Sequence, residues 1–205
     1  GKNGVSMMRS SSSDIGLAFL KRARGKKSIE LNLKNETDKR LFLKLAATAD
    51  VIVENFRFGV TKRLGIDYEQ VKKINSKIIY CSITGYGNTG PEKTKKAFDA
   101  TIQAASGLMS VTGQPEGTPT KIGSSMADTI AGTFALSGIL ASLIQRDKTG
   151  IGEFIDVSMN DCLTSLLYDE PWDCFGELGL EKRQGNRIMR FSPCLLYTSD
   201  AADES

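Results

Sequence analysis

The sequence predicts an α/β protein with a Rossmann-like parallel sheet flanked by helices. Short apolar, β-branched segments alternate with longer segments of helix-forming residues, and the connections between them are short. This alternation is typical of parallel sheets, in which a crossover helix joins one strand to the next. A length of 205 residues, 40% of them hydrophobic, is enough for a domain with its own core.

Each element is marked by a local pattern. Alternating or β-branched runs indicate strands, and leucines spaced among helix formers indicate helices. A glycine stop in "KTGIG" is expected to end the longest helix. The expected strands cover residues 28–33, 50–56, 77–84 and 153–159. The expected helices cover residues 35–49, 67–75, 98–108, 125–146 and 160–170.

Composition divides the chain into three parts. Residues 1–27 form a polar lead-in, which is rich in serine and then basic. Residues 28–193 carry the regular strand and helix patterns and are expected to form the α/β portion. Residues 194–205, "CLLYTSDAADES", are expected to be a non-native tail, because they resemble a translated sequencing adapter.

Charge and cysteine content exclude several classes of protein. A net charge of +3 gives no electrostatic case for a nucleic acid or a membrane surface as partner. The four cysteines show no C-x-x-C spacing, so we expect reduced thiols and no zinc site. Residues 1–14 lack the apolar core of a signal peptide, and the apolar run over 130–144 is shorter than a bilayer requires. We therefore expect a cytoplasmic protein.

The sequence contains no histidine. This absence removes Ser-His-Asp and Cys-His catalysis, H-E-x-x-H metal sites and any imidazole acid–base pair. Nucleophilic or acid–base chemistry is therefore left to Asp, Glu, Lys, Tyr, Cys or Ser.

The segment "GYGNTG", residues 85–90, matches the G-x-G-x-x-G fingerprint of dinucleotide-binding proteins and follows an expected strand. Pro91 and the charged "EKTKK" come next, and they are not typical of a helix that packs on a sheet. The alternatives are a phosphate-binding turn and an ordinary mobile loop, and the second is favoured.

Several basic residues could bind phosphate groups. They are residues 21–27, which include "KRARGKK", and the side chains of Lys34, Arg57, Lys62 and Arg63, which lie on the carboxyl side of expected strands. Ligands of α/β proteins bind at that edge of the sheet. Surface charge explains the same residues equally well.

Two aspartates lie five residues apart in "FIDVSMNDCL", residues 154–163. Asp156 lies within an expected strand, where a carboxylate usually accepts hydrogen bonds. Asp161 lies at an expected helix start, and its spacing from Ser158 matches a capping box. A carboxylate there stabilises a helix by about 0.3–1 kcal/mol. The same helix-end amides would keep it ionised and oriented as a nucleophile, so both interpretations remain open.

Taken together, these segments resemble the class III CoA-transferases, a family that includes carnitine, bile-acid and formyl-CoA transferases and acyl-CoA racemases. The resemblance covers about residues 26–190. It rests on the order of the motifs "VENFRFGVTKRLG", "CSITGYG", "KKAFDATIQAASGLMSVTG", "GIGEFIDVSMND" and "QGNR". It implies the central part of that fold, with further family segments expected before residue 1 and after about residue 193.

The family's chemistry implies roles for individual residues. A family aspartate attacks the acyl-CoA thioester and forms a mixed anhydride, then an enzyme-bound CoA thioester, from which CoA passes to an acceptor acid. By the motif "VSMND" the resemblance implies that this nucleophile is Asp161. CoA is then a substrate, and no tightly bound cofactor or metal is expected. The resemblance places CoA contacts at Leu31, Lys34, Asn55, Phe56, Arg57, Arg63, Lys96, Ala97, Phe98 and Asp99.

The racemase branch differs at two positions. It has a histidine where this sequence has Phe98, paired with an aspartate that corresponds to Asp128. Without the histidine, two-base racemisation lacks one base, so Asp128 is expected to be structural and a transferase is favoured. The alternatives are an acyl-CoA racemase or isomerase and a truncated, non-catalytic CoA-binding fragment. The expected partners are acyl-CoA and a small carboxylic acid, and the resemblance implies an interlocked homodimer.

Overall fold

The computed structural model describes residues 21–170, 172–177, 179 and 182–186. The chain divides into two compact units, residues 1–42 and 43–205. The expected non-native tail lies outside the described residues, and the lead-in is described only from residue 21. The domain boundaries drawn from composition therefore stay predictions.

The first unit has no strand among its described residues, so the strand predicted over 28–33 is wrong. Two asparagine side chains form local turns at the end of this segment and just after it. The Lys34 amide donates to Asn32 Oδ1 at 3.2 Å, and the Thr37 amide donates to Asn35 Oδ1 at 2.8 Å. Such bonds compete with a sheet ladder and favour a turn before a helix.

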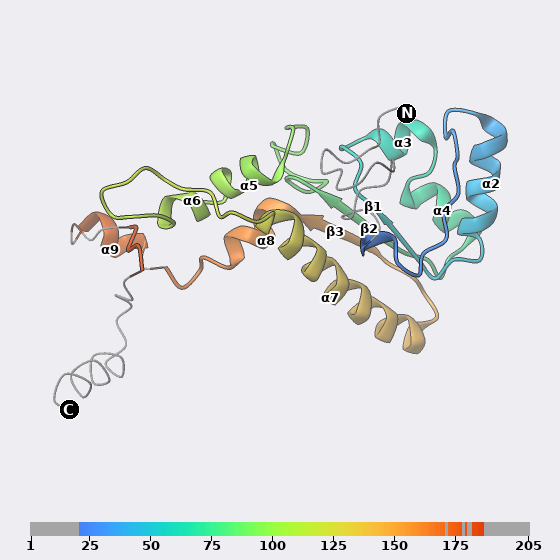
Figure 1. Ribbon diagram of the computed structural model, residues 1–205. Coiled ribbons are helices and arrows are strands. Elements are labelled where there is room, and N and C mark those ends of the chain that lie inside the picture. Colours follow the sequence, from blue (N-terminus) through green and yellow to red (C-terminus); the bar gives the residue numbers. More distant parts are fainter. Residues whose placement is uncertain (1–20, 171, 178, 180–181, 187–205) are drawn as a thin grey trace. The chain divides into compact units, whose positions relative to one another are not determined.

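The second unit is built on a parallel sheet of three strands in the order β1-β2-β3, which confirms the predicted α/β class (Figure 1). The strands are β1 (Val51–Glu54), β2 (Ile79–Thr84) and β3 (Phe154–Ser158). From residue 36 onward, the helices that the structure describes are α2 (Glu36–Ala46), α3 (Val60–Leu64), α4 (Tyr68–Ile74), α5 (Asp99–Ala105), α6 (Leu108–Val111), α7 (Met126–Thr149), α8 (Met159–Ser165) and α9 (Trp172–Glu177). The predicted strands other than the first and all predicted helices are confirmed, while α3, α6 and α9 were not predicted.

Alternation along β2 and β3 directs side chains to opposite faces of the sheet. Cys81 and Val157 belong to the buried cluster that also contains the small residues of α7. Tyr80 and Phe154, which are register partners, point the other way and contact Tyr68 of α4, with the Tyr68 and Phe154 ring centroids 5.4 Å apart. Each face of the sheet is therefore covered by a helix, as a parallel sheet requires.

Helix α7 packs on β2 and β3 (Figure 1). It does so through a face of small residues. Ala127, Ala131 and Ala135 are buried on that face, whereas Leu136 and Leu140 are more than half exposed. By length and apolar composition alone, this 24-residue helix could cross a membrane. The apolar run over residues 130–144, on which the sequence expectation rested, is shorter than the helix that contains it. Core helices of soluble proteins meet the same criterion, so the observation is weak support for a membrane helix.

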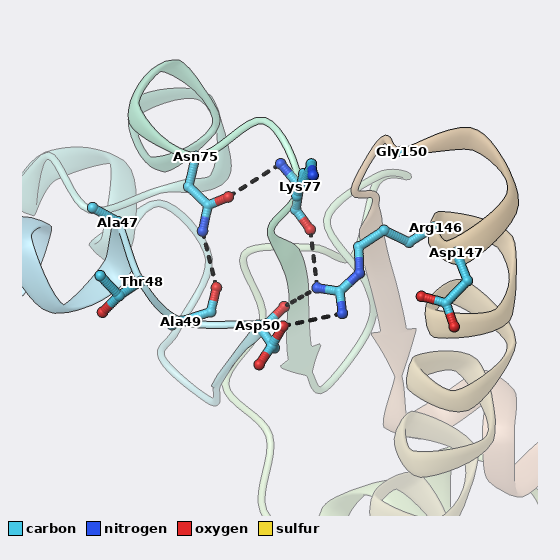
Figure 2. Close-up of a pocket in the computed structure, with 9 residues that line it drawn as sticks. All are labelled: Ala47, Thr48, Ala49, Asp50, Asn75, Lys77, Arg146, Asp147 and Gly150. Carbon is cyan, nitrogen blue, oxygen red and sulfur yellow. Dashed lines mark hydrogen bonds and ion pairs between the residues drawn. The ribbon is translucent and has the colours of Figure 1, made fainter.

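A cavity of about 500 Å³ lies at the amino-terminal edge of the strands (Figure 2). Arg146 of α7 reaches across this edge, and its guanidinium donates to the carbonyl oxygens of Asp50 and Lys77, both at 3.3 Å. It also forms an ion pair of 3.1 Å with the Asp50 carboxylate. Because Arg146 is satisfied by these partners, it holds the end of α7 against the starts of β1 and β2 and is not free to bind a ligand.

We expect Arg146→Ala to lower the free energy of unfolding by about 1–3 kcal/mol, because the variant loses the packing of a largely buried side chain and its hydrogen bonds to the Asp50 and Lys77 carbonyls. The ion pair itself contributes little, since the Asp50 side chain is 79% exposed. Urea denaturation measures the change. The control is Lys148→Ala in the same last turn of α7, for which a change within about 0.5 kcal/mol is expected. Equal stability of the two variants would contradict this role of Arg146.

Candidate active site

The carboxyl ends of the three strands meet at one edge of the sheet, because the strands are parallel. Residues 55–57 follow β1, residues 85–98 follow β2, and Asp161 follows β3. This is the edge at which open α/β sheets bind ligands. The fold thus brings the predicted nucleophile and the predicted CoA-contacting residues of the second unit to one edge.

Asp161 lies in the first turn of α8 and is exposed. Its amide donates to the Ser158 hydroxyl at 3.2 Å, which confirms the predicted cap at the helix start. Among the residues that the structure describes, none donates a hydrogen bond to the Asp161 carboxylate. The backbone of Asp161 is therefore fixed, while its carboxylate is open to react with a ligand.

The "GYGNTG" loop is not a dinucleotide-binding turn. The next helix of the chain is α5, which begins only at Asp99, so the loop does not open a helix against the sheet. It is also not a free loop, because the Asp156 carboxylate accepts from the Asn88 amide at 2.8 Å and from Asn88 Nδ2 at 2.9 Å. The expectation that Asp156 accepts hydrogen bonds within its strand is confirmed.

Gly85 joins this loop to two other segments of the edge. Its carbonyl accepts from the Asn160 amide at 3.0 Å, one residue before Asp161. A Cβ on Gly85 would overlap the side chain of Ala97, so the loop and the "KAFD" segment approach each other closely. Residues far apart in the sequence are thereby packed around the start of α8.

The Asp99 side chain is used to hold α7. Its Oδ1 accepts from the Ala127 amide at 2.8 Å, and its Oδ2 accepts from Gln103 Nε2 at 2.7 Å. The N-cap residue of α7, Ser125, makes no side-chain cap of its own, so Asp99 supplies a missing acceptor from α5. Asp99 therefore has a structural role in the fold, and its contact with CoA stays a prediction.

The other predicted CoA contacts differ in how free their side chains are. Asn55 Nδ2 donates to the Ile83 carbonyl at 2.6 Å and so ties the end of β1 to β2. Ala97 is half-buried against Gly85. Asn55 is exposed, and the other predicted contacts of the second unit that are exposed are Phe56, Arg57, Arg63, Lys96 and Phe98. In the first unit, Leu31 is half-buried and Lys34 is exposed.

The thiols near this edge are poor nucleophiles. Burial, with smaller contributions from Glu54 and Asp156, raises the pKa of the Cys81 thiol from 9.0 to about 11. Burial and then the Asp161 carboxylate raise the pKa of Cys162 as well. Because the thiolate is the reactive form, these shifts disfavour Cys81 and Cys162 as nucleophiles.

Sequence reasoning missed three polar residues at this edge. Asn88 lies within the glycine pattern of "GYGNTG", and an asparagine that follows a strand is a signal for side-chain bonding to the loop. Thr84 Oγ1 and Asn160 Oδ1 are buried with no hydrogen-bond partner among the described residues. Within the residues that the structure describes, no group of three or more His, Cys, Asp or Glu residues could hold a metal ion.

Comparison with known proteins identifies the family. The model of CoA-transferase family III matches residues 4–203. The chain is 44% identical over 183 residues to the acetyl-CoA:oxalate CoA-transferase of Acetobacter aceti, a match that covers 88% of this chain and 46% of that protein. It is 41% identical over 170 residues to the succinate–glutarate CoA-transferase of Agrobacterium fabrum, covering 83% and 42%. The chain thus spans less than half the length of these relatives.

Solved structures agree with the sequence comparison. A CAIB/BAIF family protein from Brucella suis superimposes with a TM-score of 0.75 and 38% identity, over 82% of this chain and 45% of that one. The structure of Rv3272 from Mycobacterium tuberculosis gives a TM-score of 0.69 and 31% identity, over 75% and 43%. The chain therefore belongs to CoA-transferase family III.

Proposed function

We propose that the protein transfers CoA from an acyl-CoA donor to a carboxylic acid, with Asp161 as the covalent nucleophile. The observation that carries this proposal is the exposed Asp161 carboxylate, which has no donor among the described residues and stands on a backbone fixed by Ser158. Relatives named as CoA-transferases with dicarboxylate substrates support it.

The proposed reaction is an exchange of carboxylates. An Asp161 oxygen attacks the thioester carbonyl and expels CoA thiolate, which leaves a mixed anhydride. The thiolate then attacks the Asp161 carbonyl, which releases the donor acid and forms an aspartyl-CoA thioester. The acceptor carboxylate attacks that thioester and forms a second anhydride with release of the thiolate. Attack of the thiolate on the acceptor's acyl carbon gives the new acyl-CoA and returns the Asp161 carboxylate.

We further propose that exposed side chains at the same edge bind CoA. Arg57, Arg63 and Lys96 supply cations that suit the phosphates of CoA, and Phe56 and Phe98 offer exposed aromatic rings. Leu31 and Lys34 remain predicted contacts from the first unit.

A transfer assay tests this function in the complete gene product. Acetyl-CoA or succinyl-CoA is the donor, and oxalate, succinate or glutarate is the acceptor. We expect a new acyl-CoA that forms only when both are present, and no exchange of the α-hydrogen with deuterated water. Deuterium exchange without an acceptor would instead indicate a racemase or isomerase. Thermal stabilisation by CoA without any transfer would reduce the proposal to binding alone.

We also propose a homodimer in the cytoplasm. The exposed apolar side chains of Leu136, Leu140 and Ile144 on α7 support burial of this helix against further protein. Light scattering of the complete gene product would give the mass of a monomer if the dimer is wrong.

A further inference from the structure

Asn88 bridges two neighbouring strands at the edge that carries Asp161. Ser82 of β2 and Asp156 of β3 are register partners and point to the same face of the sheet. The Asn88 side-chain amide donates to Ser82 Oγ at 3.1 Å and to Asp156 Oδ1 at 2.9 Å. The Asn88 backbone amide donates to Asp156 Oδ2 at 2.8 Å. One carboxylate thus accepts both kinds of amide from a single loop residue.

The loop that contains Asn88 is also hydrogen-bonded to the start of α8. Three residues before Asn88, the Gly85 carbonyl accepts the amide of Asn160 at 3.0 Å. Between them, Gly87 has a φ of 80°, and a Cβ there would lie 3.6 Å from Ser158 and 3.7 Å from Asp156. Residues 85–88 therefore lie along β3 from Asp156 to Ser158, the last residue of the strand. At the end of this segment, the Gly85 carbonyl bonds the amide of Asn160, the residue before Asp161.

The exposure of Asp156 decides what these bonds do. Asp156 is exposed, so water competes for its carboxylate and its contribution to global stability is small. Its hydrogen bonds are nevertheless charge-assisted and converge on one residue, so they select one loop geometry. The Asp156 carboxylate therefore affects the position of the loop that contains Asn88 more than the free energy of unfolding.

We propose that Asp156 is a positioning residue for the transfer reaction, which acts through Asn88 and the Gly85 carbonyl to fix the first turn of α8 and hence Asp161. This inference rests on the proposed function. Asp156 does not touch the reacting atoms. It sets the geometry of the residue that does, and an error of about 1 Å at a nucleophile costs about 100-fold in rate.

A charge exchange across the bridge tests the proposal in the complete gene product. Asn88→Asp places two carboxylates against each other and should free the loop. The double variant Asn88→Asp with Asp156→Asn restores a carboxylate–amide pair with its sides exchanged, and the oxygen of the new amide at position 156 can still accept the backbone bond. The control is Thr89→Asp, which adds the same charge to an exposed neighbour.

Two readouts are expected to move together. In Asn88→Asp the amide of Asn160 should exchange hydrogen about tenfold faster. kcat should fall about 10- to 100-fold, while KM for acyl-CoA stays within about threefold. The double variant should recover both, and Thr89→Asp should change neither. If Asn88→Asp does not fold, Asn88→Ala removes the side-chain donors without added charge and gives the same comparison.

Three results would overturn the inference. They are an unchanged Asn160 exchange rate in the single variant, a kcat loss that the double variant does not recover, and a rise in KM with kcat unchanged. Failure of the proposed function is distinguishable, because the unaltered protein would then transfer no CoA. In that case the exchange rate of Asn160 alone decides whether Asp156 fixes the start of α8.

Discussion

Asp161→Ala is expected to reduce CoA transfer by about 1,000-fold or more, because the proposed covalent intermediates form on the Asp161 carboxylate and α8 contains no other carboxylate. The variant should remain folded. Loss of a first-turn carboxylate costs a helix about 0.3–1 kcal/mol, and the Ser158 bond uses the backbone amide at position 161, which the substitution retains. The measurement is kcat/KM with thermal denaturation of the same preparation.

The matched control for this experiment is Asp169→Ala. Asp169 is an exposed carboxylate a few residues beyond α8, so its loss changes the net charge equally. We expect activity within about twofold of the unaltered protein, as for surface substitutions in general. An Asp161→Ala enzyme that matches this control would refute Asp161 as the nucleophile.

Gly152→Ala is expected to lower the free energy of unfolding by about 3 kcal/mol or more, or to prevent folding. Gly152 leads into β3, and its amide donates to the Ser76 carbonyl at 2.9 Å. A Cβ there would overlap the Ile78 carbonyl oxygen and the Lys77 backbone at the start of β2. Backbone atoms of a sheet cannot move aside as a flexible side chain can, so the pairing of β2 with β3 must shift. Urea denaturation measures the loss.

Gly132→Ala is the control, since Gly132 lies within α7 and a Cβ would meet nothing within 4 Å. Alanine is favoured over glycine in a helix by about 1 kcal/mol, so this variant should be slightly more stable. If both variants retain full stability, the close approach of Gly152 to β2 is wrong.

The parts of the fold that local pattern determines were predictable. Strand β2 is a run of β-branched and apolar residues, and α7 is a long run of helix formers ended by Gly150 in the left-handed conformation, with a φ of 73°. The strand predicted over 28–33 failed because alternation indicates a strand only where another strand can pair, and the Asn32 amide instead donates to the Asp38 side chain at 2.8 Å. Helix α3 is only five residues long, too short for a helical period to be evident.

The candidate site was predictable in its residues but not in its connections. The position of Asp161 at a helix start followed from a cap pattern only four residues long, which the structure confirms. The bond between Asp156 and Asn88 joins residues 68 apart, and no local pattern specifies it. The same holds for Asp99, whose acceptor role depends on an amide of α7, 28 residues further along the chain. The first contact depends on the register of the sheet and the second on the packing of α5 against α7, and only the folded chain defines either.

The most direct test of the central claim is mass spectrometry of the complete gene product after incubation with acyl-CoA and hydroxylamine. Hydroxylamine attacks an activated aspartyl carbonyl and leaves a stable hydroxamate on the residue that formed the intermediate. The account predicts a hydroxamate on the peptide that contains Asp161, dependent on acyl-CoA and absent from Asp161→Ala. Turnover with an unmodified Asp161, or a hydroxamate on another carboxylate, would contradict it.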